Sequence, residues 1–192
     1  NTNPNLNLTT TAEELIDVFK LRSDVYTEIS NLHKEINYKD QYKDEIEGLN
    51  FDKYDKNSAI IYYKNNDQIT GTTRVIFDSK NKLPVENKFS FDYIRKQNNK
   101  IGELSRLAVK QKEGLNLEFK NLFQGIHQIT IKNNIDVAIA VILKDYYKLY
   151  SKFGGIQIEK ELDSYGTINT SNLVVSWNPH IASSFFKKRF LM

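Results

Sequence analysis

The chain has 192 residues, of which 40% are hydrophobic, and a formal net charge of +3. This size fits one compact domain with a single core. We therefore expect residues 1–192 to form a single domain, with residues 1–10 disordered. The absence of cysteine excludes disulfides, cysteine-bound zinc and a thiolate nucleophile. No apolar run has the length of a membrane helix and no secretion-signal core is present, so we expect a cytoplasmic protein without stable membrane insertion.

The first predicted element is an amphipathic helix over residues 12–29. Thr11 and Glu14 have the spacing of a capping box, and apolar side chains then recur on one helical face. Residues 30–50 are polar and rich in tyrosine without a clean period, so a short helix and a loop are expected there.

Apolar runs of strand length and helical repeats follow in alternation through the rest of the chain. We expect strands at 58–64, 69–77, 101–109, 135–143, 156–161 and 173–177, and helices around 119–126 and 146–153. The tight turn at 65–67 makes the first two strands an antiparallel hairpin, which disfavours a purely parallel sheet. The order predicts an α/β fold in which helices cover both faces of a mixed sheet.

Two charged residues lie in GELSRLAV, a segment expected to be a central strand. Buried charges need partners, so Glu103 and Arg106 belong either to a structural ion-pair network or to a catalytic site, and both interpretations stay open. In a regular strand Glu103 and Ser105 share one face while Arg106 points to the other. A contact between Glu103 and Arg106 would therefore require a β-bulge.

The loop after this strand contains Gln111 and Gly114. Such a loop can present backbone N–H groups and a helix N-terminus to a phosphate, and the nearby Lys110 and Lys112 would favour one. An ordinary strand-to-helix turn that contains a glycine is the alternative.

Further charges lie in apolar surroundings: Arg22, Asp52, Asp55 and Arg74. The two aspartates could bind a metal ion or a cationic substrate, or belong to a solvated turn. Arg74 is expected to point inward, where its guanidinium demands carboxylates such as those of Asp52 and Asp55. The three histidines have no ligand spacing, so we expect no metal site.

Five segments resemble, in their order and spacing, the acyl-homoserine-lactone synthases and the long-chain N-acyl amino acid synthases, both of the GNAT fold. The resemblance covers most of residues 12–153. It rests on LRSDVY (Arg22, Tyr26), FDKYD (Asp52, Asp55), GTTRVI (Gly71, Arg74), LPVENKF (Pro84, Phe89) and ELSRLAV (Glu103, Ser105, Arg106, Val109).

The resemblance implies a GNAT-type mixed sheet and an N-acyltransferase. The donor would be an acyl-pantetheine thioester on an acyl carrier protein, in preference to coenzyme A, and the acceptor a small amine or an amino acid such as tyrosine. No tightly bound cofactor is implied. Leu32 stands where lactone synthases usually carry a tryptophan that helps to hold S-adenosylmethionine, and Asn116 breaks the GNAT pyrophosphate-loop pattern. A lactone synthase using S-adenosylmethionine is the nearest alternative, and a non-catalytic GNAT-like binding module is another.

Residue roles follow as hypotheses. The catalytic group is Glu103, Ser105 and Arg106, with Glu103 taking the proton of the acceptor amine. The pantetheine-binding group is Leu107, Ala108, Val109, Gln111 and Gly114. The residues expected to shape the substrate site are Arg22, Tyr26, Asp52, Asp55, Arg74 and Phe89. Basic residues expected to meet an acidic carrier protein are Lys110, Lys112, Arg95 and Lys96. The basic C-terminal cluster is too short to indicate nucleic-acid binding, and we expect none.

Overall fold

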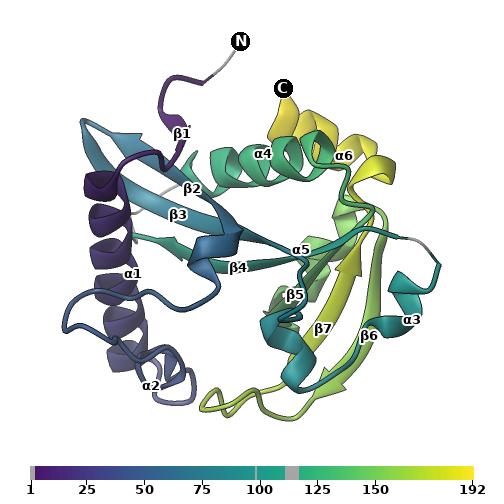
Figure 1. The fold of residues 1–192 in the computed structure, drawn as a ribbon, viewed down its shortest axis with the longest axis horizontal. Helices are drawn as coiled ribbons and strands as arrows, with labels where there is room; N and C mark the ends of the chain where they lie inside the picture. Colours follow the sequence, from purple (N-terminus) through teal and green to yellow (C-terminus); the bar gives the residue numbers. More distant parts are fainter. Residues whose placement is uncertain (1–2, 98, 111–116) are drawn as a thin grey trace.

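The computed structural model describes residues 3–97, 99–110 and 117–192. Within them the chain forms a mixed sheet with strand order β1-β2-β3-β4-β5-β7-β6 (Figure 1). The strands are β1 (Leu6–Leu8), β2 (Ser58–Asn65), β3 (Gln68–Phe77), β4 (Ile101–Val109), β5 (Val137–Leu143), β6 (Ile156–Leu162) and β7 (Asn172–Trp177). The predicted α/β architecture with a mixed sheet is confirmed.

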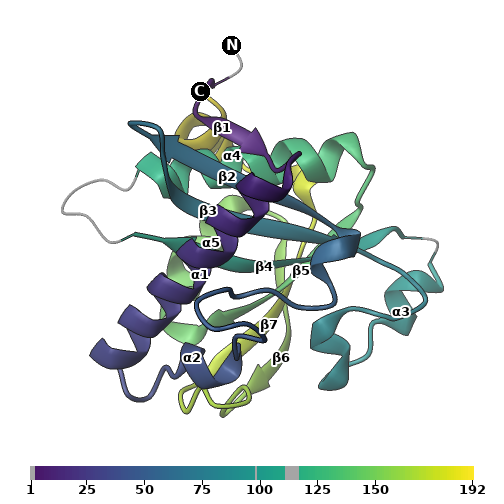
Figure 2. The same ribbon diagram turned by 60° about the vertical axis from the view of Figure 1, so that its left-hand side comes forward.

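Two long helices cover opposite faces of the sheet (Figures 1 and 2). Helix α1 (Ala12–Leu32) packs Leu21 and Val25 against Ala108 of β4, whereas α4 (Leu117–Lys132) packs Leu122 against Val75 of β3. The capping box of Thr11 and Glu14 is present at the start of α1. The other helices are short: α2 (Tyr38–Gln41), α3 (Asp92–Arg95), α5 (Tyr147–Tyr150), α6 (Ser184–Phe186), the π-helix Lys187–Leu191, and 3₁₀ turns at Asp55–Asn57, Pro84–Asn87, Lys144–Tyr146, Ser151–Phe153 and Pro179–Ile181.

The β2–β3 hairpin forms where the sequence predicts it. Asn66 and Asp67 both take positive φ angles, 50° and 62°, which are the angles that a two-residue hairpin turn requires. Asparagine and aspartate tolerate this conformation better than other non-glycine residues, so the turn follows from the local sequence.

Two expectations are corrected. The prediction of disorder over residues 1–10 is wrong for the described part of that segment, because Leu6–Leu8 form β1 and pair with β2. The helix expected around 146–153 is a succession of a 3₁₀ turn, α5 and a second 3₁₀ turn. Gly154 and Gly155 end it with φ angles of 77° and 70°, which glycine adopts without strain.

Strands β4 and β5 are parallel neighbours that soon part. In the described chain they pair only from Ile101 to Glu103, opposite Val137 to Ile139. Beyond that point β4 continues beside β3, while β5 continues beside β7, so the two strands diverge (Figure 1). The divergence opens the sheet at its centre. In the same described residues, none of the helices is both long enough and apolar enough to cross a membrane.

We predict that Leu122→Ala lowers the free energy of unfolding by about 2–5 kcal/mol, because a fully buried leucine between α4 and the sheet is truncated. The matched control is Leu117→Ala on the same helix, where the side chain is 53% exposed and the cost should stay within about 0.5 kcal/mol. Urea unfolding followed by circular dichroism measures both. Equal losses for the two variants would contradict the packing described for α4.

Candidate active site

A cavity of about 220 Å³ lies where β4 and β5 diverge. One end is polar and is lined from the sheet by Thr73, Glu103, Ser105 and Arg106. Tyrosines surround it: Tyr26, Tyr38, Tyr42, Tyr146 and Tyr165. The remaining wall is largely apolar and includes Phe123, Ile142, Phe153, Val175 and Trp177. The cavity therefore suits a ligand with a polar reacting end and an apolar tail.

A β-bulge at Arg106 determines which side chains reach the polar end. The β3–β4 register shifts between Thr72, opposite Ala108, and Arg74, opposite Ser105, so β4 carries one additional residue. Arg106 takes a φ of 57°, a left-handed conformation that costs a non-glycine residue about 1–2 kcal/mol. The bulge turns Arg106 to the face of Glu103 and Ser105. Without a bulge, the alternation of a regular strand would have placed Arg106 on the opposite face.

Asp52 links the two arginines of this face. Its carboxylate accepts hydrogen bonds from Nη1 and Nη2 of Arg74 at 2.7 and 2.9 Å and from Nη2 of Arg106 at 2.6 Å. Arg74 also donates from Nε to the Ser105 hydroxyl at 2.9 Å. Burial alone would raise the pKa of Asp52, but the hydrogen bonds and charge of Arg74, with those of Arg106, hold it well below its ordinary value. Asp52 is therefore a permanent anion in this network.

Asp55 extends the network to α1. Its Oδ1 lies 2.8 Å from Nη1 of Arg22 and 2.9 Å from Nη1 of Arg74. Burial opposes ionisation, yet the charges of Arg22 and Arg74 lower the pKa of this carboxyl too. The inward orientation and the carboxylate partners predicted for Arg74 are both found in the structure. Asp52 and Asp55 are ion-pair partners in the interior and not members of a solvated turn.

Several polar atoms at this end have no hydrogen-bond partner among the described residues. They include Nε and Nη1 of Arg106 and the hydroxyl of Tyr26, all buried and all on residues that line the cavity. The Arg106 guanidinium also lies over the ring of Tyr42, with 3.7 Å between its Cζ and the ring centroid. Buried donors without partners are costly, and a ligand that accepts hydrogen bonds would relieve that cost.

Glu103 is the carboxylate of the cavity and is only 4% exposed. Its Oε2 accepts a hydrogen bond from the backbone N–H of Val85 at 3.0 Å. Burial raises the pKa of Glu103 to about 7, against the lowering effects of the Val85 N–H and the Arg74 charge. A carboxylate with a pKa near neutrality exchanges protons readily at physiological pH, as a general base must.

Comparisons with known proteins identify the family of the chain. The family described as N-acyl amino acid synthase FeeM matches residues 17–177. The chain belongs to the FeeM family. No functionally curated protein sequence matches significantly. Because FeeM-family proteins are acyltransferases, the chain is an acyltransferase enzyme. The description of the family as N-acyl amino acid synthases indicates that the acyl group is transferred to an amine.

Solved structures show the same fold. FeeM, an N-acyl amino acid synthase from uncultured soil microbes, superposes with a TM-score of 0.70 at 14% identity, covering 97% of this chain and 94% of that one. The AHL synthase LasI gives 0.63 at 15% identity, covering 96% and 94%. The CoA-dependent acyl-homoserine lactone synthase BjaI, solved with SAM and isopentyl-CoA, gives 0.66 at 14% identity, covering 94% and 84%.

The structure brings most of the expected site residues of this FeeM-family chain together, though not all at the cavity. Arg22, Asp55 and Arg74 are joined by ion pairs next to the polar end and do not line the cavity. The expected site residues that line it are Tyr26, Glu103, Ser105, Arg106 and Leu107. The side chains of Ala108 and Val109 pack in hydrophobic clusters, so only their backbone remains available for a ligand. Phe89 makes edge-to-face ring contacts with Phe91 and Tyr93 outside the lining. Gln111, Gly114 and Lys112 lie outside the described residues.

Of the tyrosines near Arg106, only Tyr26 was predicted from the sequence; Tyr38, Tyr42 and Tyr165 were not. Tyr38 and Tyr42 stand four residues apart on and after α2 and stack at 5.8 Å between ring centroids, while Tyr165 comes from the connection between β6 and β7. The i, i+4 spacing of Tyr38 and Tyr42 was a readable signal of one aromatic face. For Tyr165 no local signal existed, because only the sheet order brings that connection to the cavity.

We predict that the stability of the chain depends on pH through Glu103. Because the folded-state pKa of about 7 exceeds the ordinary 4.5, the folded state retains a proton between these values that the unfolded chain has lost, so stability falls as pH rises through this window. Relative to Glu103→Gln, wild type should lose about 1–3 kcal/mol from pH 4.5 to 7.5. Urea unfolding at several pH values measures the difference, with the exposed Glu13→Gln as control. A difference that does not change with pH would exclude the raised pKa.

Proposed function

We propose that the chain transfers a long-chain acyl group from the pantetheine thioester of an acyl carrier protein to the α-amine of an amino acid. The observation that supports this most is that Glu103 and the unpartnered donors of Arg106 both lie at the polar end of a mainly apolar cavity. A base, an anion-binding group and an apolar chamber are the parts that acylation of an amino acid needs.

The donor thioester is proposed to lie along β4 beyond Glu103. There β4 no longer pairs with β5, so the backbone N–H groups of the Leu107 to Val109 segment are the proposed donors for the pantetheine amide and the oxyanion. The acyl tail would enter the apolar part of the cavity, where each buried CH₂ contributes about 0.8 kcal/mol. Because the chain has no cysteine, transfer is direct from the donor to the acceptor, without a cysteine-bound intermediate.

The acceptor is proposed to be an α-amino acid. Its carboxylate would accept hydrogen bonds from Nε and Nη1 of Arg106 and from the Tyr26 hydroxyl, the buried donors that lack partners. The rings of Tyr38, Tyr42 and Tyr165 beside Arg106 would favour an aromatic side chain, which makes tyrosine the first acceptor to test.

The chemistry is one acyl transfer with one proton relayed. The acceptor ammonium first releases one proton to solvent. The neutral amine nitrogen then attacks the thioester carbonyl, which forms the C–N bond and the tetrahedral oxyanion, and Glu103 takes a proton from that nitrogen, directly or through a water. Collapse of the tetrahedral oxyanion restores the carbonyl and breaks the C–S bond. Glu103 then returns the proton to the departing thiolate, so that the products are an amide and a free pantetheine thiol.

Of the basic residues expected to meet a carrier protein, Arg95 and Lys96 do not form one surface with Lys110. Arg95 and Lys96 precede β4 and Lys110 follows it, and a nine-residue strand is about 30 Å long. Arg95 is moreover engaged with three carboxylates, Asp78, Glu86 and Asp92. The preference for a carrier protein over coenzyme A therefore rests on the interrupted pyrophosphate-loop pattern at Asn116.

The first experiment offers the protein matched acyl-carrier-protein and coenzyme A thioesters with a panel of amino acids and with S-adenosylmethionine. We expect N-acyl amino acids by mass spectrometry, formed fastest from the carrier thioester. Acyl-homoserine lactone as the main product would establish the lactone synthase instead, for which Leu32, 60% exposed at the end of α1, supplies no tryptophan.

Glu103→Gln tests the base. It should slow release of free pantetheine thiol about 10²–10⁴-fold with little loss of helix and strand content, because general base catalysis is removed while the side chain keeps its size. Glu45→Gln, at an exposed loop position, is the matched control and should keep the wild-type rate. An unchanged rate in Glu103→Gln would remove this carboxylate from the mechanism.

Arg106→Lys tests the acceptor site. The substitution keeps the charge beside Asp52 but removes the forked donors, so KM for tyrosine should rise about 10–100-fold. With tyramine, which lacks the carboxylate, the KM of Arg106→Lys should be close to that of wild type. Steady-state kinetics with both acceptors gives the comparison, and Arg189→Lys at an exposed C-terminal position is the control. Parallel losses for tyrosine and tyramine would place the carboxylate elsewhere.

A further inference from the structure

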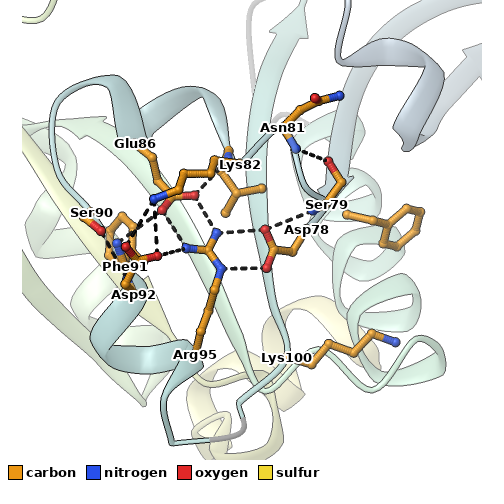
Figure 3. Close-up of polar contacts among 12 residues, drawn as sticks. Asp78, Ser79, Asn81, Lys82, Glu86, Ser90, Phe91, Asp92, Arg95 and Lys100 are labelled. Atoms are coloured by element: carbon orange, nitrogen blue, oxygen red, sulfur yellow. Dashed lines mark hydrogen bonds and ion pairs between the residues drawn. The ribbon is translucent and has the colours of Figure 1, made fainter.

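A second charged cluster lies on the connection between β3 and β4, outside the cavity lining (Figure 3). At its centre the guanidinium of Arg95 holds Asp78 through Nε and Nη2 at 2.7 and 2.8 Å. It holds Glu86 through Nη1 and Nη2 at 2.7 and 2.5 Å, and Asp92 through Nη1 at 3.0 Å. These contacts match the five N–H donors of arginine, so the guanidinium is fully used.

Glu86 fastens the backbone of the connection from within. Its side chain is only 2% exposed, and besides Arg95 it accepts hydrogen bonds from the N–H groups of Leu83 at 2.9 Å and Phe91 at 3.3 Å. Burial opposes its ionisation, but Arg95 and the two N–H groups lower the pKa of Glu86 below its ordinary value. The anion therefore ties three points of the connection together at neutral pH.

The fastened turn carries the hydrogen-bond donor of Glu103. Val85 is fully buried and packs with Leu83 and Phe91 in the cluster of Ile76 and Ile139 below the sheet. Its N–H donates a hydrogen bond to Oε2 of Glu103 at 3.0 Å. Leu83 and Phe91, which Glu86 holds on either side, leave the Val85 N–H little freedom to move away from the carboxylate.

Other groups face Glu103 from each element around it. They are Arg74 from β3, Asp52 from the segment before β2, Arg106 from β4 itself and Tyr165 from the β6–β7 connection. Of the hydrogen bonds and charges that favour its ionised form, the Val85 N–H is the largest, ahead of Arg74 and Arg106.

We propose that the Arg95–Glu86 ion pair is a positioning device for the active site: it locks the Leu83–Phe91 turn so that the Val85 N–H holds the Glu103 carboxylate in one orientation in the wall of the cavity. Arg95 and Glu86 touch no substrate in this arrangement. They act through Val85. The inference rests on the proposed role of Glu103 as the base, but the contact itself does not depend on that role.

The experiment measures the protonation of Glu103 directly. The side-chain ¹³Cδ resonance of Glu103, assigned by its loss in Glu103→Gln, is titrated by NMR in wild type and in Arg95→Met. Without the Arg95–Glu86 ion pair the Val85 N–H is free to move away from Glu103. The ionised form of Glu103 then loses this hydrogen bond, and its pKa should rise by about one unit. The acid limb of the kcat/KM profile should move to higher pH by the same amount.

Two further variants keep the test decisive. Lys82→Met removes an exposed cation of the same connection that pairs with Asp92 and not with Glu86, so the pKa of Glu103 should stay at its wild-type value. Arg95→Lys retains the charge but cannot bind two carboxylates at once through a planar guanidinium, so the pKa of Glu103 should rise by less than in Arg95→Met. If Arg95→Met does not fold, Arg95→Lys provides the test.

The outcomes separate this proposal from the proposed function. An unchanged or lowered pKa of Glu103 in a folded Arg95 variant overturns the positioning role. A raised pKa without movement of the kcat/KM profile supports the positioning contact and counts against Glu103 as the base. A raised pKa together with a displaced profile supports both.

Discussion

The parting of β4 from β5 is the constraint on which the rest of the site depends. Backbone N–H and C=O groups in a protein interior need partners, and two parallel strands that separate after Glu103 expose such groups on both inner edges. The gap must be filled by side chains or by a ligand. Bulky residues of α4, β7 and the α5 region close it at the apolar end, whereas at the β4 end hydrogen-bonding capacity is left over. The cavity is thus polar and apolar at its two ends because of the way the sheet opens.

The charges behind this opening are nearly balanced. Arg22, Arg74 and Arg106 face Asp52 and Asp55, and burial raises the pKa of the neighbouring Glu103 to about 7, so its charge changes around neutral pH. With Glu103 protonated the set carries one excess positive charge. The proposed amino-acid acceptor, with its carboxylate at Arg106 and its ammonium near an ionised Glu103, would leave this charge balance undisturbed, whereas a simple amine would add one positive charge.

Local sequence periodicity was enough for the hairpin, the two long helices and the central strands, because each has its own alternation or helical repeat. Residue type was enough to single out Arg74 and Glu103, since a charge in an apolar strand must find partners. The direction of Arg106 was beyond such reasoning, because nothing in GELSRLAV identifies the residue that adopts a positive φ. The same holds for Tyr165 and for the Val85 N–H, which reach the cavity and Glu103 only through long-range packing. Phe89 packs against the cluster under the sheet instead of lining the cavity, and its aromatic character in the sequence suited either position, so its role in the site stays a prediction.

Glu103 occupies the last position at which β4 is held on both sides. Its backbone pairs with β3 at Ile76 and with β5 at Ile139, and its carboxylate is fixed from a third direction by Val85. Two residues further along β4 only the pairing with β3 remains, and at Arg106 that pairing is interrupted by the bulge. A base gains from rigidity because its distance to the reacting nitrogen is then set in advance. An anion-binding arginine needs donors that are still free, and a strained bulge with incomplete pairing provides them. The change from full to partial pairing along four residues of one strand would therefore separate the two proposed tasks, with the proposed base, Glu103, on the fully paired side and the proposed acceptor-binding group, Arg106, on the partly paired side.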